Sequence, residues 1–576
     1  MNPILILFSF MLASCGNTQH TQSTEKTSPQ QVISSELPIP SETINIKDYG
    51  AKGLGVASLK EDTIALRKAI AYLNSKGGGR LYVPNPPKFY AFAGDGVFVG
   101  DNIEIYGDGK GKSEIRNVDP LSGSFLHGPI FLFSTYGATD KINVFQEGIE
   151  QYDISDAKLN DQQVVLKNPA NGSKLFKGEI VVLGSGKFNH GTDEGKSRFH
   201  YMELNEISAI TNGEILFKYP LSVNLVSEDG SLPVIVNINN TPSQNKFLGI
   251  KNGTSKNIYL HDMSLTQAQK NEVTNQILSK DEMTNGLSGV WQPGGAFASK
   301  FNNLYISCYS GLGGNMFTRC EFSNIDLEAK KKLIDFGYGA SNNSVHDINW
   351  IYMKSSASDF ASSFIIVNDG THNIDLYNIK ASGDWSGENI ILLSQAKNIN
   401  IYDAVFDFPN YSNSSTGVSI GDKDESFSEN ILLSNIKINI SKIGFFITMN
   451  GENTINEKDR KLKLSNLTFS GVATGDRNFI ESTGGNPKKT QKKSEKVSNN
   501  NKIGIGFLAR NINGLEIQGL STSSGDFLFL NCNNTSIQKI NAPYSNLITK
   551  NSSINTSGNT FRQTMTDVKK IKSGKN

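Results

Sequence analysis

The stretch "KNINIYDAVF" at residues 397–406 and the stretch "HNIDLYNIKA" at residues 372–381 carry the same short pattern. In both, two apolar residues alternate with polar residues, and an Asn or Asp then comes just before a third apolar residue. The apolar residues correspond at an offset of 25 residues: Ile374 with Ile399, Leu376 with Ile401 and Ile379 with Ala404. Alternation with a period of two predicts a short strand, and the Asn or Asp predicts a bend near its end.

The same pattern recurs along much of the chain. Further copies are Ile258–Leu260–Met263, Cys320–Phe322–Ile325, Ile431–Leu433–Ile436, Leu462–Leu464–Leu467 and Leu515–Ile517–Leu520, with weaker copies at Leu304–Ile306–Tyr309 and Thr535–Ile537–Ile540. Strands repeated once per coil of roughly 20–30 residues stack into a solenoid with one continuous core. Helical periodicity is scarce beyond residue 80, so we expect an all-β protein built as a parallel β-helix. A β-sandwich whose strands are similar by chance is the alternative.

Composition indicates a large globular chain and narrows its partners. The 576 residues include 54 Gly and only 17 Pro, and this length is enough to bury a long core. The formal net charge of +1 lacks the basic excess of a dedicated nucleic-acid-binding protein. Four Cys do not make a disulfide framework, and Cys308, Cys320 and Cys532 are expected to be buried thiols. Without CxxC or HExxH spacing, the sequence predicts no zinc site.

The N-terminus reads as an export signal. Residues 3–17, "PILILFSFMLASCGN", contain an apolar run that is too short to span a bilayer. Its end, Leu12-Ala13-Ser14-Cys15, resembles the lipobox of bacterial lipoproteins, which implies lipidation at Cys15 and anchoring to the bacterial cell envelope at the outer membrane. An ordinary cleaved signal peptide is the alternative, and the run lacks the preceding Lys or Arg of both patterns. The polar residues 16–41 predict a flexible tether.

Residues 44–84, "INIKDYGAKGLGVASLKEDTIALRKAIAYLNSKGGGRLYVP", carry a second informative pattern. It resembles the N-terminal entry of the pectate-lyase-like superfamily through Asp48-Tyr49-Gly50-Ala51, the helix start Asp62-Thr63, an amphipathic helix through Leu73, and Gly77-Gly78-Gly79 before the strand Arg80–Val83. This superfamily includes polygalacturonases, rhamnogalacturonases, polysaccharide lyases and phage tailspikes. The resemblance implies a right-handed β-helix over residues 42–550. Asp62 or Thr63 should cap the helix, whose apolar residues Ile64, Ala65, Ala69, Ile70 and Leu73 should close the end of the solenoid.

The resemblance implies a carbohydrate substrate, often an acidic one, but it carries over no catalytic residue. The Gly-His-Gly and Arg-Ile-Lys motifs of the polygalacturonase branch are absent. Residues 138–225 predict a small β-rich insertion, residues 484–503 a basic disordered excursion and residues 551–576 a C-terminal tail. We expect a monomer that binds an acidic polysaccharide or oligosaccharide. No cofactor is expected, although Ca²⁺ remains open.

A loop of the insertion, "GKFNHGTDEGKSRFHYMELNE" at residues 186–206, gathers groups that suit an anionic sugar. They are Lys187, His190, Lys196, Arg198, His200 and Tyr201. A solvated loop between hairpin strands is the alternative.

The outward residues of the repeat predict a second candidate site. The first, third and sixth positions of each copy face the core, while the second and fourth face solvent and stack into ladders about 4.8 Å apart. If Val345–Trp350 is another copy, His346 lies between Glu321 and Asp375 in the second-position ladder, and Asp347 faces the core.

Further candidates surround His346 in this reading. Arg319 lies beside Glu321, Lys331 and Tyr338 follow in the same coil, and Tyr377 belongs to the fourth-position ladder. Trp291 and Trp385 are candidates to stack on sugar rings.

Three functions are compatible with these residues. β-Elimination on a uronate needs a cation for the carboxylate, a base for the α proton and an acid for the departing oxygen. We assign His346 as the acid, Tyr338 or Lys331 as the base and Arg319 as the cation, and these cations favour elimination. Hydrolysis by Glu321 and Asp375, roughly 9–10 Å apart by strand spacing, is the alternative. A surface protein that binds glycans without catalysis is the third.

Overall fold

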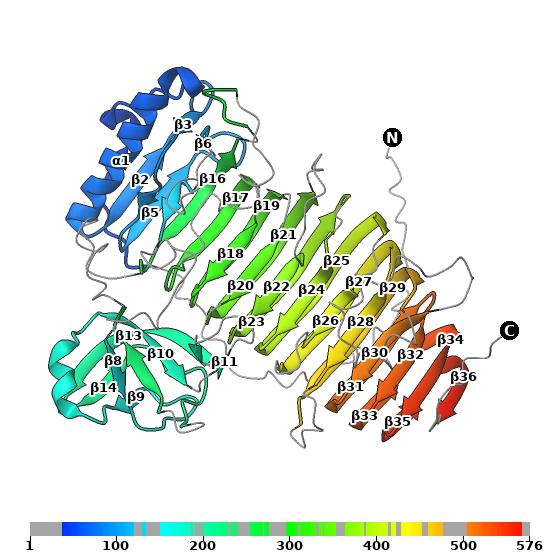
Figure 1. The fold of residues 1–576 in the computed structure, drawn as a ribbon. Coiled ribbons are helices and arrows are strands. Elements are labelled where there is room, and N and C mark those ends of the chain that lie inside the picture. The colour runs from blue at the N-terminus through cyan, green and yellow to red at the C-terminus, as the bar shows by residue number, and fades with distance from the viewer. Residues whose placement is uncertain are drawn as a thin grey trace, which may run out of the picture. The chain divides into compact units, whose positions relative to one another are not determined.

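The computed structural model is a parallel β-helix, shown in Figure 1. It describes residues 37–119, 129–133, 150–185, 188–189, 197–198, 201–227, 232–238, 254–268, 270–275, 295–308, 311–329, 333–337, 339–352, 363–384, 387–412, 416–421, 428–451, 459–475 and 504–566. The largest sheet joins 26 of the described strands. In it, β23 (His372–Ser382) pairs in parallel with β25 (Lys397–Ser412), with Ile374 opposite Ile399 and Leu376 opposite Ile401. The offset of 25 residues is therefore one coil, which confirms the predicted fold class.

The solenoid strands up to β32 fall into three groups. They are long strands that turn a corner between two faces, shorter strands that form a third face, and the short strands of the first coils. Long strands that turn a corner between two faces are β16 (Tyr259–Gln267), β17 (Lys300–Cys308), β19 (Glu321–Ala329), β21 (Ser341–Tyr352), β23, β25, β27 (Glu429–Ile443), β29 (Leu462–Ala473) and β31 (Asn513–Thr522). The third face consists of β18 (Leu312–Asn315), β20 (Ile334–Gly337), β22 (Ile365–Asn368), β24 (Asn389–Ser394), β26 (Thr416–Ile420), β28 (Phe445–Asn450), β30 (Ile505–Arg510) and β32 (Asp526–Leu530). The first coils contain β1 (Thr43–Asn45), β2 (Gly79–Val83), β3 (Tyr90–Phe92), β4 (Val97–Phe98), β5 (Ile103–Gly107), β6 (Glu114–Asn117) and β7 (Phe131–Leu132).

The bend predicted at Asn or Asp is a left-handed backbone turn that recurs from coil to coil. Its residues have φ between 50° and 56°, a region that Asn and Asp tolerate better than most residues: Asp262, Asn303, Asn324, Asp347, Asn378, Asp403, Asn435 and Asn466. Their side chains hydrogen-bond along the solenoid. The amide of Asn324 donates to Asn303 at 3.0 Å, and that of Asn466 donates to Asn435 at 3.0 Å. This bend ladder holds successive coils in register. Asp347 belongs to it and is exposed, so the prediction that Asp347 faces the core is wrong.

In two coils a polar residue at the first inward position shifts the register from the one predicted. Ser299 and Asn343 occupy the first inward position, which Ile374 fills one coil after Asn343. Both are fully buried and hydrogen-bonded: Ser299 Oγ accepts from Ile258 N at 3.0 Å, and Asn343 Nδ2 donates to Phe317 O at 2.7 Å. The sequence pattern therefore starts too late in these coils: Leu304 is the sixth position of its coil and Val345 is the third, so Leu304–Ile306–Tyr309 and Val345–Trp350 are not in the predicted phase.

The N-terminal helix α1 (Leu59–Lys76) closes the solenoid with a slightly different face from the one predicted. Ala65, Leu66, Ala69, Ile70 and Leu73 are buried in the same core cluster as the coils, whereas Ile64 is 39% exposed. Ser58 occupies the N-cap, although its side chain forms no capping hydrogen bond with the helix backbone, so the cap predicted at Asp62 or Thr63 is wrong.

Asp62 has a different role in this region. It is buried and accepts from Lys52 N at 2.7 Å, Ser58 Oγ at 2.6 Å and Ala91 N at 3.1 Å. Its carboxylate therefore ties three chain segments to the cap.

The C-terminal coils run past the predicted boundary at residue 550. β33 (Asn533–Gln538) and β34 (Asn541–Lys550) are followed by β35 (Ile554–Ser557) and β36 (Thr560–Thr566), which lie in the range predicted as a tail. These last strands are mostly polar because they end the stack, and the apolar alternation that marks inner coils is missing from them. The predicted excursion at 484–503 lies outside the described residues.

The insertion forms a separate six-stranded sheet with the order β8-β15-β10-β13-β14-β9. Its strands are β8 (Gln151–Asp153), β9 (Gln163–Val165), β10 (Ile180–Ser185), β13 (Tyr201–Thr211), β14 (Glu214–Phe217) and β15 (Val234–Val236), with a small hairpin of β11 (Phe188–Asn189) and β12 (Ser197–Arg198). Because β15 belongs to this sheet, the insertion extends beyond residue 225. A second apolar cluster joins the sheet to the coils through residues such as Val182, Leu204 and Phe297.

The described residues include three cysteines. Cys308, Cys320 and Cys532 are buried free thiols, as predicted. None of the helices in the described residues combines the length and apolar character needed to cross a membrane.

A second ladder of Asn side chains runs along the corner opposite the bend ladder, just before the first inward position of the coils. A substitution in this second ladder tests whether side-chain ladders hold the coils together. Asn398 has φ of 55°, donates to Asn373 at 2.6 Å and accepts from Asn430 at 2.7 Å. Asn398→Ala should lower the free energy of unfolding by about 2–4 kcal/mol, because it loses two hydrogen bonds and because Ala adopts a left-handed conformation less readily than Asn does. Asn398→Gly, which loses only the hydrogen bonds, should cost less in denaturant titrations. An alanine variant as stable as the wild type would contradict this account.

Candidate functional site

One outward ladder of the solenoid carries two groups of aromatic residues. Its members lie in register from coil to coil: Tyr82, Tyr106, His261, Asn302, Ser323, His346, Tyr377, Tyr402, Ser434, Ser465, Gln518 and Gln538. They occupy the fourth repeat position, directly before the bend ladder. His346 therefore lies between Ser323 and Tyr377, which corrects the prediction that it lies between Glu321 and Asp375. The cause is the buried Asn343, which begins this coil two residues earlier than predicted.

His346 is held by two carboxylates and a tyrosine. Its Nδ1 lies 2.7 Å from Asp347 Oδ2, and its Nε2 lies 3.5 Å from Glu321 Oε1. The Tyr377 ring stacks on the imidazole at 4.7 Å with an interplanar angle of 8°, and Tyr402 continues the stack at 4.9 Å. A neutral imidazole that donates from Nδ1 would turn the Nε2 lone pair toward Glu321, so this geometry favours the doubly protonated ring.

The carboxylates shift the ionisation of His346 and are shifted in return. Pairing with Glu321 raises the pKa of His346 above its ordinary value of 6.5, burial opposes this shift, and Asp347 adds to it. The same contact with His346 lowers the pKa of Glu321 and that of Asp347. Burial raises the pKa of Tyr377, and it raises the pKa of Tyr402 to about 12. These shifts favour a charged imidazole beside ionised carboxylates and neutral phenols.

Glu321 and Asp375 do share the second-position ladder, with Ser344 between them. Asp375 accepts a hydrogen bond from Asn400 at 2.7 Å. Lys300 precedes Glu321 in this ladder, and its charge also lowers the Glu321 pKa.

Arg319 does not join the His346 ladder. It takes a left-handed φ of 57° at the opposite corner, in the position that Asn342 and Asn373 occupy in the next coils. Its side chain is 7% exposed, with the guanidinium 4.3 Å from the centre of the Tyr219 ring and Nη2 3.2 Å from Pro220 O. Burial lowers the Arg319 pKa, and the charge of Glu203 opposes that shift. The insertion therefore occupies the guanidinium predicted to neutralise a substrate.

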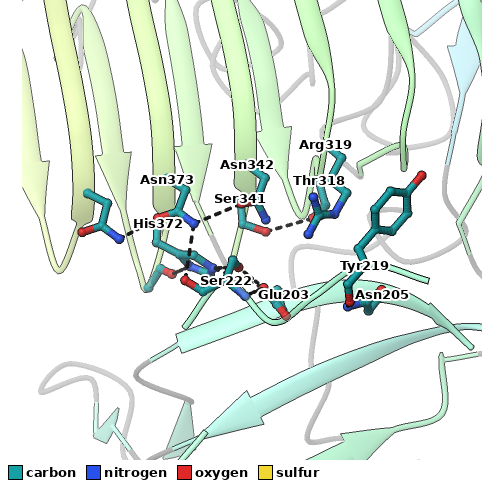
Figure 2. Close-up of polar contacts among 12 residues, drawn as sticks. Glu203, Asn205, Tyr219, Ser222, Thr318, Arg319, Ser341, Asn342, His372 and Asn373 are labelled. Carbon is teal, nitrogen blue, oxygen red and sulfur yellow. Dashed lines mark hydrogen bonds and ion pairs between the residues drawn. The ribbon is translucent and has the colours of Figure 1, made fainter. Parts of the chain in front are cut away.

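Figure 2 shows the buried polar junction between the insertion and the coils, which lies around Glu203, Ser222 and His372. Ser222 Oγ lies 2.9 Å from His372 Nε2, and the Ser222 hydroxyl donates to Glu203. His372 Nδ1 donates to Gly370 O at 3.0 Å, and Glu203 lies 3.7 Å from Nε2, on the same side of the ring as the Ser222 hydroxyl, whereas in a nucleophilic triad the carboxylate faces the other ring nitrogen. Because Glu203 and His372 are at most 1% exposed, these residues hold the insertion in place rather than meet a substrate.

Several predicted site residues fall outside the described residues. They are Lys331, Tyr338, Trp291, Trp385, His190 and His200, together with Lys187 and Lys196 and the lipidation site Cys15. Arg198 lies in β12, where only its backbone is described.

Sequence reasoning missed the first aromatic group of the ladder, Tyr82, Tyr106 and His261. The sequence did contain the information for His261, because this residue holds the fourth position of the Ile258–Leu260–Met263 copy, just as Tyr377 holds the fourth position of its own copy. The large gap in sequence between residues 106 and 261, which the insertion fills, hid their adjacency. Among the described residues, no group of three or more His, Cys, Asp or Glu side chains is arranged to hold a metal ion.

Comparisons with known proteins show no family for this chain. No protein-family model and no curated protein matches the sequence. A surface adhesin of Streptococcus pneumoniae, PfbA, is 10% identical with a TM-score of 0.41, covering 93% of this chain and 97% of that chain. The tailspike gp61 of Pseudomonas phage phi297 is 12% identical with a TM-score of 0.40, covering 92% and 76%. An exopolygalacturonase of Thermotoga maritima is 11% identical with a TM-score of 0.27, covering 91% and 93%. Such values leave function to be argued from the site.

The pairing of His346 with Glu321 can be tested by titration. Glu321→Gln should lower the pKa of His346 toward 6.5, as followed by NMR of the imidazole resonances. Glu516→Gln, in the same second-position ladder but far from His346, serves as the control. An unchanged His346 pKa in Glu321→Gln would refute the pairing.

The same shifts set a pH window for stability. Because the folded pKa of His346 is raised, its contribution is complete below pH 6.5 and is lost as the pH rises through the folded value. The lowered pKa values of Glu321 and Asp347 give stability that is present above 4.5 and 3.8 and is lost as the pH falls through their folded values.

Proposed function

We propose that this protein cleaves or dehydrates an acidic, uronate-containing glycan by β-elimination, with His346 as the proton donor. The observation that carries this proposal is the imidazole kept charged by Glu321 and Asp347 on an outward, partly exposed ladder. An imidazole that acts as a proton donor must be in its charged form at the working pH, and these two carboxylates favour that form.

The reaction requires three groups around one sugar. A base removes the proton from the carbon next to the carboxylate, the electron pair forms a carbon–carbon double bond, and the carbon–oxygen bond at the β position breaks. The departing oxygen takes a proton from His346 Nε2, which is the less tightly held of the two ring nitrogens. Tyr338 or Lys331 is proposed as the base on sequence grounds. Arg319 is not proposed for the carboxylate, because the insertion occupies its guanidinium.

Hydrolysis is the second candidate, since Glu321 and Asp375 lie two coils apart in one ladder. It requires one carboxyl group to be protonated before the bond breaks. His346 lowers the Glu321 pKa, and the amide of Asn400 donates to Asp375, so both contacts favour the ionised form. For this reason elimination is preferred.

Elimination, hydrolysis and binding without catalysis can be distinguished by their products or by the lack of a product. The wild-type protein should be incubated with polygalacturonate, alginate, glycosaminoglycans and sulfated algal glycans. New ultraviolet absorbance from an unsaturated uronate indicates elimination, and new reducing ends alone indicate hydrolysis. Saturable binding without product indicates a glycan-binding surface protein.

Removal of the imidazole should abolish most of the turnover. On the glycan that yields product, His346→Ala should lower kcat by about 10²–10⁴, the usual contribution of a positioned acid or base. Folding should change little, because His346 is outside the core. Gln518→Ala, farther along the same ladder, should keep wild-type kcat. Full activity of His346→Ala would move the active site to another face.

We also propose that Cys15 is lipidated and anchors the protein to the bacterial envelope, on the basis of Leu12-Ala13-Ser14-Cys15. Cys15→Ser should release the protein from the membrane fraction while leaving its thermal unfolding unchanged, because the predicted tether makes no core contacts. Unchanged membrane association would exclude lipidation at this residue.

A further inference from the structure

Two stacks of rings are separated by a short gap on the outward ladder. The upstream stack is Tyr82, Tyr106 and His261, with ring centres 5.3 Å and 5.6 Å apart. The downstream stack is His346, Tyr377 and Tyr402. The gap carries only Asn302 and Ser323, which are hydrogen-bonded at 2.7 Å. Each stack has its imidazole in the coil next to the gap, and the Tyr259 ring also stacks on His261 at 4.0 Å. Ser323 is 3% exposed, so a ligand meets the gap mainly at Asn302 and at the two imidazoles.

The two imidazoles are held in the same way. His261 Nδ1 lies 2.8 Å from Asp262, the next residue, and its Nε2 lies 2.9 Å from Glu104 of the preceding coil. His346 has the equivalent partners Asp347 and Glu321. The repeat does not require this arrangement, because the ladder places Ser or Gln at this position in the coils after Tyr402. The gap is thus bordered on both sides by a carboxylate-held imidazole.

A loop brings one lysine to the edge of this gap. The loop between β5 and β6 crosses the bend ladder, with Gly109 N donating to Asp262 O at 2.8 Å and Gly111 N donating to Ser264 Oγ at 2.8 Å. Lys110 Nζ then lies 3.1 Å from Asn324 Oδ1 and 3.0 Å from Asp326 Oδ2. Asn324 directly follows Ser323 in the chain, so the ammonium group lies beside the gap.

Lys110 is free to change partners at low cost. The Asp326 side chain is 44% exposed and that of Lys110 is 20% exposed. An ion pair this close to water contributes little to stability, so a substrate carboxylate can compete with Asp326 for the ammonium group.

We propose that Lys110 binds the carboxylate of a uronic acid that lies in the gap beside His346. This proposal rests on the proposed elimination and supplies the cation that Arg319 does not. Elimination requires that the carboxylate and the departing oxygen of the same sugar meet different groups at the same time. His346 belongs to the coil after Ser323 and Asn324, about 4.8 Å along the solenoid, and Lys110 lies at the bend that follows Ser323, so the proposed sugar spans from this bend to the ladder position of His346.

The test compares binding of charged and uncharged polymers. Lys110→Met keeps the aliphatic stem and removes the charge. Its affinity for polygalacturonate or alginate, whichever the wild type binds, should fall about tenfold, as expected for loss of one charge pair at a binding site. Its affinity for the same polymer with its carboxyl groups reduced to alcohols should stay the same. Lys463→Met, which removes a surface ion pair with Glu516 elsewhere on this face, is the matched control and should leave both affinities unchanged.

A second variant separates substrate binding from the ion pair with Asp326. Asp326→Asn frees the ammonium group, so it should keep or increase the affinity for the acidic polymer. If Asp326→Asn weakens binding as much as Lys110→Met does, or if Lys110→Met binds like the wild type, the proposal is overturned. A wild type that neither binds nor cleaves any acidic glycan would instead overturn the proposed function, and this inference with it. Thermal unfolding of each variant confirms that its fold is intact.

Discussion

The left-handed bend at Asn and Asp is the constraint on which the rest of the structure depends. It lets one strand continue from one face to the next, so a coil needs few residues to turn this corner. The conformation costs most residues roughly 1–2 kcal/mol, and Asn and Asp adopt it more readily because their side chains form local hydrogen bonds. The amide ladders through residues such as Asn303, Asn324, Asn435 and Asn466 fix each coil on the next. Outward side chains consequently stack in continuous ladders, and the candidate site is one of them.

Two positions with a left-handed backbone but without Asn or Asp lie where the insertion packs on the solenoid. At the opposite corner, the Asn residues 342, 373, 398 and 430 form a second ladder. Ala298 and Arg319 replace Asn there, both with positive φ, and both lie where the insertion packs. The corner has exchanged side-chain amides for contacts with another sheet. Arg319 is thus a residue of the junction, which explains why a cation only two residues before Glu321 does not serve the same face.

The sequence predicted the repeat, the coil length and the inward apolar positions, because alternation and bend residues are local signals. It failed for the coils that begin on Ser299 and Asn343, where hydrogen bonds replace apolar packing at a core position. Because Asn343 takes the place of an apolar residue in the repeat, the sequence pattern assigned His346 to the second-position ladder, whereas it lies in the fourth-position ladder.

Contacts between distant segments were beyond prediction. Lys110 meets Asp326 across 216 positions, and Ser222 meets His372 across 150. Nothing in the local pattern of either residue indicates its partner. The pairing of His346 with Glu321 was predicted correctly in kind, since a shift of two residues leaves the two side chains diagonal neighbours.

The central claim is that an acidic glycan binds along the outward ladder between the two ring stacks. The most direct measurement is a crystal structure of the His346→Ala protein soaked with an unsubstituted uronate oligosaccharide, in which the slowed reaction preserves the bound chain. The account predicts sugar density over Asn302 and Ser323, with a carboxylate within hydrogen-bonding distance of Lys110 Nζ. Sugar bound on another face of the solenoid, or on the insertion with the ladder empty, would contradict it.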